Sequence, residues 1–207
     1  MTPVERIYDV FLSQITDEMF ALLRPSVVRR ELHKYLEGAT VQFRECKNSL
    51  VITNYSFNEL DLPLGEDTIL LPKDREKGIE VIGLETGIEY KEGIDWNIKI
   101  NEESREQLVF EIPPSEQVKI ELYNNGSIEG DLTLEEIYIL AQGMNFYWLH
   151  PKLNEEENLH QVLTDGDYKR LSGANMLDKM IKLYKTSQRE LELAVIKYTY
   201  NDMEMFN

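Results

Sequence analysis

Residues 132–153 of this chain read "LTLEEIYILAQGMNFYWLHPKL". This stretch predicts a helix that is apolar on nearly every side and that carries a run of three aromatic residues at 146–148. Thr133 and Glu136 have the spacing of a capping box, and Pro151 is expected to end the helix just after His150. A helix this apolar must be covered by other helices of the chain or of a partner. We therefore expect it at the centre of a helical bundle.

The composition is that of a folded protein with a strong acidic excess. Of the 207 residues, 42% are hydrophobic and 29% are charged, and 38 acidic against 22 basic residues give a net charge of −16. Such a field repels phosphate backbones and anionic lipid. Arg24, Arg29, Arg30 and Lys34 cluster on one expected helix, but neighbouring glutamates dilute them, so we interpret this surface as a solvated helix face.

The cysteine content and the start of the chain indicate a protein made in the cytosol. Cys46 is the single cysteine, which excludes an internal disulfide and fits a reducing compartment. The opening "MTPVERIYDV" lacks the features of a signal peptide, and no apolar run reaches the roughly 18 residues of a membrane span. We therefore expect a soluble protein with no membrane partner.

The N-terminal quarter is predicted to be helical. Thr2 and Glu5 have the spacing of a capping box, with Pro3 at the first helical position, and a second cap is expected at Thr16. Pro25 breaks or restarts the helical pattern that follows.

Between residues 62 and 130 the apolar period changes from helical to two. Five runs predict strands separated by glycine, proline and asparagine turns: "DTILLP", "IEVIGL", "DWNIKI", "QLVFEI" and "VKIELY". Residues 61–130 hold 17 acidic and 7 basic residues, a net charge of −10, so most of the acidic excess lies on this piece. We expect a small antiparallel β-sandwich or barrel-like domain there.

These patterns predict an α+β protein in which a β domain is inserted into a helical bundle. Residues 1–61 and 131–207 form the two parts of the helical domain, and 62–130 form the insertion. An inserted domain costs little loop-closure entropy when its two ends lie close together, as they do if its first and last strands are adjacent.

The last predicted helix runs from about Thr164 to Tyr198. Its expected packing seam has spacings of 4, 3, 4, 3 and 4: Leu177, Ile181, Tyr184, Gln188, Leu191 and Val195. The tail that follows the helix carries apolar residues with no core of their own to bury them.

No constellation of catalytic or metal-binding residues is apparent. His33, His150 and His160 lack a metal-ligand spacing, and the sequence "DGDYK" at 165–169 places basic residues where a calcium loop needs oxygen ligands. Cys46 has no identifiable base nearby, and no glycine-rich phosphate loop occurs. We therefore expect neither an enzyme nor a bound cofactor or metal.

One alternative places function in the β domain. Trp96 and Tyr90 could form a sugar platform beside acidic residues, as in a carbohydrate-binding or glycan-cleaving protein. Trp96, however, alternates with Ile98 and Ile100, which favours an inward position in the core.

Four segments resemble the head-to-tail connector (adaptor) proteins of tailed bacteriophages of Gram-positive hosts. They are "TPVERIYDVFLSQI", "YLEGATVQFRECKNSL", "LTLEEIYILAQGMNFYWLHPKL" and "DYKRLSGANMLDKM", and the resemblance covers the helical two thirds of the chain. The inserted β domain departs from the smallest, all-helical adaptors.

The resemblance implies a virion protein of the phage neck, assembled in the host cytoplasm as a ring typically of twelve copies. Its partners would be the portal protein above, a downstream neck or tail-completion protein below, and DNA that passes through without specific binding. The residues expected to contact a partner are Tyr198, Tyr200, Met203, Met205 and Phe206.

Overall fold

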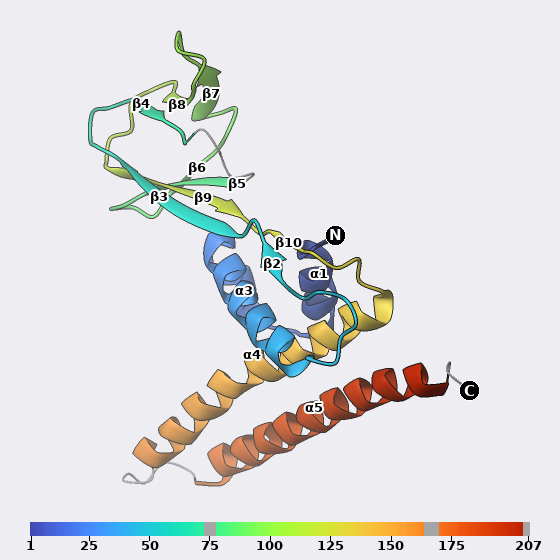
Figure 1. The fold of residues 1–207 in the computed structure, drawn as a ribbon. Helices are drawn as coiled ribbons and strands as arrows, with labels where there is room; N and C mark the ends of the chain where they lie inside the picture. The colour runs from blue at the N-terminus through green and yellow to red at the C-terminus, as the bar shows by residue number, and fades with distance from the viewer. Residues whose placement is uncertain (73–77, 164–169, 205–207) are drawn as a thin grey trace. The chain divides into compact units, whose positions relative to one another are not determined.

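The computed structural model describes residues 1–72, 78–163 and 170–204, with the side chains of 18–19, 155–176 and 201–204 left out. In this part of the chain the fold is α+β, with five helices and three antiparallel sheets (Figure 1). The chain divides into two compact units. We call residues 1–52 with 127–207 the helical unit and residues 53–126 the β unit.

The helical unit contains all five helices. They are α1 (Glu5–Gln14), α2 (Glu18–Leu22), α3 (Pro25–Gln42), α4 (Leu134–Leu163) and α5 (Arg170–Glu204). Pro25 occupies the first position of α3, where its missing N–H costs nothing, so it restarts the helical pattern as expected.

Helix α4 packs closely against α3. Ala39 lies so near Gly143 that a Cβ built on the glycine would stand 2.8 Å from the Ala39 Cβ. One turn along, a Cβ on Gly38 would stand 2.7 Å from the ring of Tyr147. The two glycines therefore allow the helix backbones to approach each other, and Tyr147 fills the space that Gly38 leaves.

The other two aromatic residues of the run in α4 contact different helices. The Trp148 ring meets Phe11 of α1 edge to face at 6.5 Å, and the Phe146 ring stacks on Tyr184 of α5 at 4.9 Å. Neighbouring residues of a helix point about 100° apart, so three consecutive aromatic side chains reach three neighbours. Helix α4 is thus covered on three sides by helices of its own chain.

Pro151 does not end α4 as expected, because the helix continues to Leu163. A proline inside a helix removes one hydrogen bond. The turns on either side are fixed by contacts that cross to Asp17: Trp148 Nε1 donates to its carboxylate at 2.9 Å, and Lys152 Nζ forms an ion pair with it at 2.9 Å. These contacts hold the residues flanking the proline on one helical path.

The N-terminal capping prediction is wrong. Val4 is the N-cap of α1 and makes no side-chain cap bond, while Thr2 lies in strand β1 (Thr2–Pro3). The Thr2 hydroxyl donates to the carbonyl of Gly130 at 2.9 Å and accepts from the amide of Leu132 at 2.8 Å. Thr2 is therefore held by a segment far away in sequence, which a local pattern cannot reveal.

Strand β1 belongs to a small sheet that lies where the chain leaves and re-enters the helical unit. Its order is β1, β10 (Ser127–Ile128) and β2 (Ile52–Thr53). Because β2 and β10 are neighbours, the two ends of the interrupted helical unit are side by side. This arrangement allows an insertion at little cost in loop-closure entropy.

The β unit holds two antiparallel sheets. The first has the order β3 (Ser56–Leu62), β9 (Val118–Asn124), β5 (Gly78–Gly83) and β6 (Glu89–Tyr90), and the second has the order β4 (Thr68–Leu70), β8 (Glu106–Phe110) and β7 (Trp96–Ile100). The five predicted strands appear as β4, β5, β7, β8 and β9. The first and last long strands of the unit, β3 and β9, pair along their whole length.

Both sheets contribute to one hydrophobic cluster. Its buried members are Leu62, Leu71, Val81, Trp96, Leu108, Phe110, Val118, Ile120 and Leu122. Strand β3 was not predicted. Its sequence "SFNELDL" supplies only Leu60 and Leu62 to this cluster, so its apolar pattern is weak. The β unit as a compact unit spans residues 53–126, which include β3.

The close approach of α3 and α4 gives a test of the packing. Gly143→Ala should lower the free energy of unfolding by about 1–3 kcal/mol, because the new methyl group overpacks the contact with Ala39. Helix propensity alone would instead raise the free energy of unfolding by about 1 kcal/mol, because alanine favours a helix more than glycine does. Urea denaturation measures the change. The double variant Ala39→Gly, Gly143→Ala should recover part of the loss, and a stabilising Gly143→Ala would contradict the packing.

Candidate functional site

Helix α5 has an inner face that packs on the rest of the helical unit. Leu191 is buried there, with Val195 packed beside it, and Tyr184 stacks on Phe146 of α4. Leu177 and Ile181 are half-buried. The predicted seam needs one correction, because Gln188 is exposed and bonds to Glu192 at 3.0 Å, while Ser187 takes the buried position. The inner face is rotated slightly toward Ser187 and Ala194.

The residues expected to form an interaction tail do not share one environment. Tyr198 is only 8% exposed and lies in the core of the helical unit, which corrects its expected role as a partner contact. Tyr200 is 65% exposed. The backbone of Met203 is part of α5 but its side chain is not described, and Met205 and Phe206 lie outside the described residues.

Tyr198 belongs to a cluster around the buried carboxylate of Glu136. Glu136 Oε1 accepts from the Tyr198 hydroxyl at 2.6 Å, from Asn48 Nδ2 at 3.0 Å and from Cys46 Sγ at 3.4 Å. Glu136 Oε2 accepts from the amide and hydroxyl of Thr133 at 2.7 and 3.0 Å. The Glu136 amide donates back to the Thr133 hydroxyl at 3.3 Å, which confirms the predicted capping box at the start of α4.

The electrostatics of this cluster favour an ionised glutamate among neutral donors. Burial opposes ionisation of Glu136, but the hydrogen bonds from Tyr198, Thr133 and Cys46 outweigh it and lower the pKa of the carboxyl. Burial, with the adjacent glutamate, raises the pKa of the Cys46 thiol to about 11 and raises the pKa of Tyr198. At neutral pH both groups are protonated and donate to the carboxylate.

This chemistry makes the cluster a structural clamp. A thiol held in its protonated form is a poor nucleophile, and burial together with the adjacent ionised Glu136 raises the pKa of Cys46 and so keeps the thiol protonated. The clamp instead joins three parts of the helical unit: the start of α4, the segment after α3 and the end of α5. The Tyr198 hydroxyl also accepts from the Lys47 amide at 3.2 Å, and its ring meets Phe43 at 5.0 Å.

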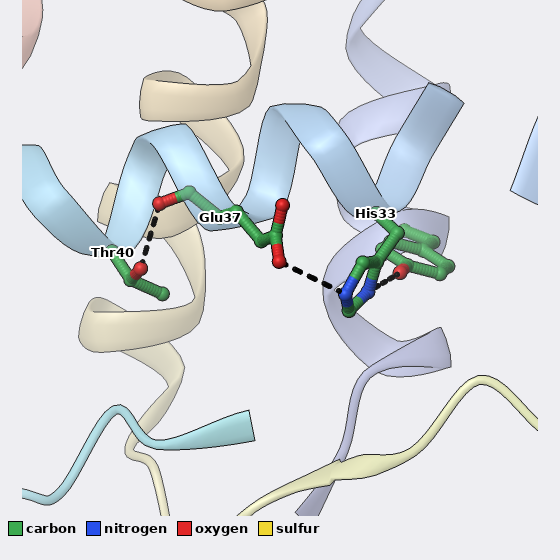
Figure 2. A network of polar contacts seen from close by, with 4 residues as sticks. His33, Glu37 and Thr40 are labelled. Atoms are coloured by element: carbon green, nitrogen blue, oxygen red, sulfur yellow. Dashed lines mark hydrogen bonds and ion pairs between the residues drawn. The ribbon is translucent and has the colours of Figure 1, made fainter. Parts of the chain in front are cut away.

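A second polar network connects α1 and α3 (Figure 2). His33 is buried, its Nδ1 lies 3.4 Å from the Tyr8 hydroxyl, and its Nε2 lies 3.5 Å from Glu37 Oε1. Burial lowers the pKa of His33 despite the opposing charge of Glu37, so the ring is neutral at pH 7. The Thr40 hydroxyl in Figure 2 donates to the backbone carbonyl of Glu37 at 2.8 Å, an ordinary helix contact. The network thus links the side chains of α1 and α3.

The alternative function placed Trp96 and Tyr90 in an open sugar platform, and the structure buries Trp96. Trp96 is 2% exposed, and its indole N–H donates to the Tyr90 carbonyl at 2.9 Å. The Tyr90 ring meets Phe110 edge to face at 5.5 Å. A sugar platform needs an aromatic face open to solvent, and here the Trp96 ring is part of the hydrophobic cluster.

The described residues contain neither a metal-binding cluster nor a membrane-spanning helix. In that part of the chain, no group of three or more histidine, cysteine or acidic residues is placed to hold a metal ion. No described helix is long and apolar enough to cross a membrane. His150 lies against the Tyr184 ring at 5.9 Å, whereas the "DGDYK" segment lies outside the described residues and the His160 side chain is not described.

The outer face of α5 is the strongest candidate for a functional surface. Leu193, Ile196 and Tyr200 are all exposed, at spacings of 3 and 4 that place them on one side of the helix, opposite the inner face. We call these three residues the outer apolar stripe. The sequence carried the signal, since the same spacing rule that predicts the inner seam also identifies this second row.

No family model matches the chain, and no curated protein matches it in sequence.

The Glu136 clamp generates a prediction for stability. Glu136→Gln should lower the free energy of unfolding at pH 7 by about 1–3 kcal/mol, because the amide nitrogen replaces an acceptor with a donor in a cluster of donors. Thermal or urea denaturation measures the loss. Tyr198→Phe should also destabilise the protein, whereas Tyr200→Phe on the exposed face should change little.

The wild type and Glu136→Gln should also differ in how their stability depends on pH. The pKa of Glu136 is lower in the folded state than its ordinary value of 4.5, so its stabilisation is present above that value and is lost as the pH falls through the folded-state pKa. The advantage of the wild type over Glu136→Gln should therefore shrink below about pH 4.5. An advantage that stays constant down to pH 3 would contradict the ionised clamp.

Proposed function

We propose that this protein is a structural component of the neck of a tailed bacteriophage, acting as an adaptor ring subunit between the portal and the tail. The observation that carries the proposal is the outer apolar stripe of α5. A contiguous apolar row on an exposed helix, beside an inner face that is already packed, is typical of a protein that binds another protein.

The polar clusters of the chain also support a structural role over an enzymatic one. Glu136 and His33 are each buried and held in networks that join helices. The resemblance of the helical segments to head-to-tail connector proteins supports the same reading. The net charge of −16 suits a conduit, because acidic walls repel the phosphates of passing DNA.

The proposal includes the finer architecture of the chain. The helical unit would be a bundle around α4, and the β unit a small two-sheet sandwich inserted into it. Two features support this: one cluster of buried residues spans several helices, and another spans both sheets of the β unit.

The expected assembly is a homo-oligomeric ring of twelve copies in the virion, assembled in the host cytoplasm. The portal protein would contact one side and a downstream neck or tail-completion protein the other, while DNA passes without specific binding. Tyr198 would anchor the end of α5 through Glu136, leaving Met203, Met205 and Phe206 for the portal contact.

Truncation of the tail tests this function. Removing residues 201–207 spares Tyr198 and its bonds, so the melting temperature should stay within a few degrees of that of the full chain. When only the truncated protein is produced, the particles should not incorporate it, and heads should fail to join to tails. Mass spectrometry and electron microscopy of the particles measure these two outcomes.

The point variant Lys34→Ala, on the exposed face of α3, serves as the control and should be incorporated normally. Normal particles carrying the truncated chain would contradict the portal contact. Absence of the full-length protein from the particle neck would contradict the function itself.

A further inference from the structure

The outer face of α5 continues beyond the outer apolar stripe as a row of basic residues. Lys179, Lys182, Lys185 and Arg189 are all exposed and follow one another at spacings of 3, 3 and 4. At about 100° per residue these spacings keep the four side chains on the side that also carries the stripe. One helix face therefore presents four basic residues, with the exposed Asp178 among them, followed by three apolar side chains.

These four side chains are not used inside the described part of the chain. None of them makes an ion pair or a hydrogen bond with a side chain that the structure describes. A row of like charges on a strongly acidic protein attracts an acidic surface. The basic row and the outer apolar stripe together are complementary to a surface that is both acidic and apolar.

The β unit of the same chain has a surface of that kind. It holds 17 acidic and 7 basic residues between 53 and 126. Three of its segments, at 84–89, 90–96 and 111–116, form a region that we call the acidic end, with Lys91 as its one basic residue. The exposed apolar residues of the acidic end are Leu84, Ile88, Ile94 and Ile112, and its exposed carboxylates are Glu85, Glu89, Glu92 and Glu111.

Hydrogen bonds hold the three segments of the acidic end together. The Glu116 carboxylate accepts from the amides of Glu85 and Thr86 at 2.7 and 2.9 Å. The Glu111 amide donates to the Asp95 carbonyl at 3.1 Å. Gly83 leaves room for this arrangement, since a Cβ there would stand 2.2 Å from Glu116 Oε1. The surface is therefore built into the fold of the β unit.

We propose that the outer face of α5 in one copy binds the acidic end of the β unit in a second copy. Four basic residues face four carboxylates, and the three side chains of the outer apolar stripe cover exposed isoleucines that otherwise stay in water. The contact joins two different surfaces, so it is heterologous and repeats from copy to copy until it closes into a ring. The ring itself is part of the proposed function, on which this inference rests. The inference adds which two surfaces of the chain would join neighbouring copies in that ring.

A charge-swap experiment on the full-length protein tests the contact. Variant one carries Lys185→Glu and Arg189→Glu on α5, and variant two carries Glu89→Lys and Glu92→Lys on the acidic end. Sedimentation velocity at low ionic strength measures self-association, and circular dichroism checks that each variant is folded. The wild type should self-associate, and association should weaken as salt screens the charges.

Each variant alone should associate about ten-fold more weakly than the wild type, because like charges then face each other. An equimolar mixture of the two variants should recover association, since each swapped surface finds its complement. The matched control, Lys34→Glu with Arg44→Glu elsewhere on the helical unit, makes the same change in net charge and should associate like the wild type.

Three results would overturn the contact. The first is a wild type that stays monomeric at low salt, and the second is a pair of variants that associate as the wild type does. The third is a change in the hydrodynamic radius of variant one without any change in mass, which would indicate binding within one chain. Neck rings that still form from variant one would reject this interface while leaving the proposed function standing. Charge-dependent association of a protein absent from the particle neck would reject the function and keep the interface.

Discussion

The three-sided burial of helix α4 is the constraint on which the rest of the helical unit depends. An apolar helix in water must be covered, and the covering here comes from segments far apart in sequence: α1 and α3 from the beginning of the chain and α5 from its end. The chain can therefore leave this unit after Ile52 and return at Ser127 without dividing the core.

The Glu136 clamp connects this packing to the proposed role of α5. An ionised carboxylate is stable in the core only when donors surround it, and Tyr198 supplies one of them from the end of α5. The bond fixes the rotation of the helix, so that Leu191 and Tyr198 point inward and Leu193, Ile196 and Tyr200 point outward. A stability device on the inner side thereby determines which residues the helix offers to a partner.

Sequence patterns predicted the features that local periodicity and capping determine. The run at 146–148, the capping box of Thr133 and Glu136, and the five strands of the β unit all have signals within about ten residues. The features that were missed depend on distant partners. Thr2 is bonded to Gly130 rather than to its own helix, and Pro151 stays within a helix whose flanking turns contact Asp17.

In the candidate site too, sequence patterns predicted what local spacing determines and missed what depends on distant partners. Heptad-like spacing placed the inner side of α5 correctly to within one position, since Ser187 rather than Gln188 is buried. It could not separate Tyr198 from Tyr200, because two tyrosines near a helix end look alike until the acceptor of one hydroxyl is known. The acidic end of the β unit was equally hidden, since its three segments are brought together by bonds to Glu116 and Asp95.

Amide hydrogen exchange of the isolated full-length protein tests the central claim most directly. If α4 is the covered core and α5 is clamped to it, the amides of residues 137–149 should exchange most slowly, and those of 184–198 should be protected to a similar degree. The outer residues of α5 need no partner for this protection, because the backbone is held from the inner side. Fast exchange throughout 184–198 while 137–149 stay protected would show that α5 is not part of the core, and the account of its two faces would fail.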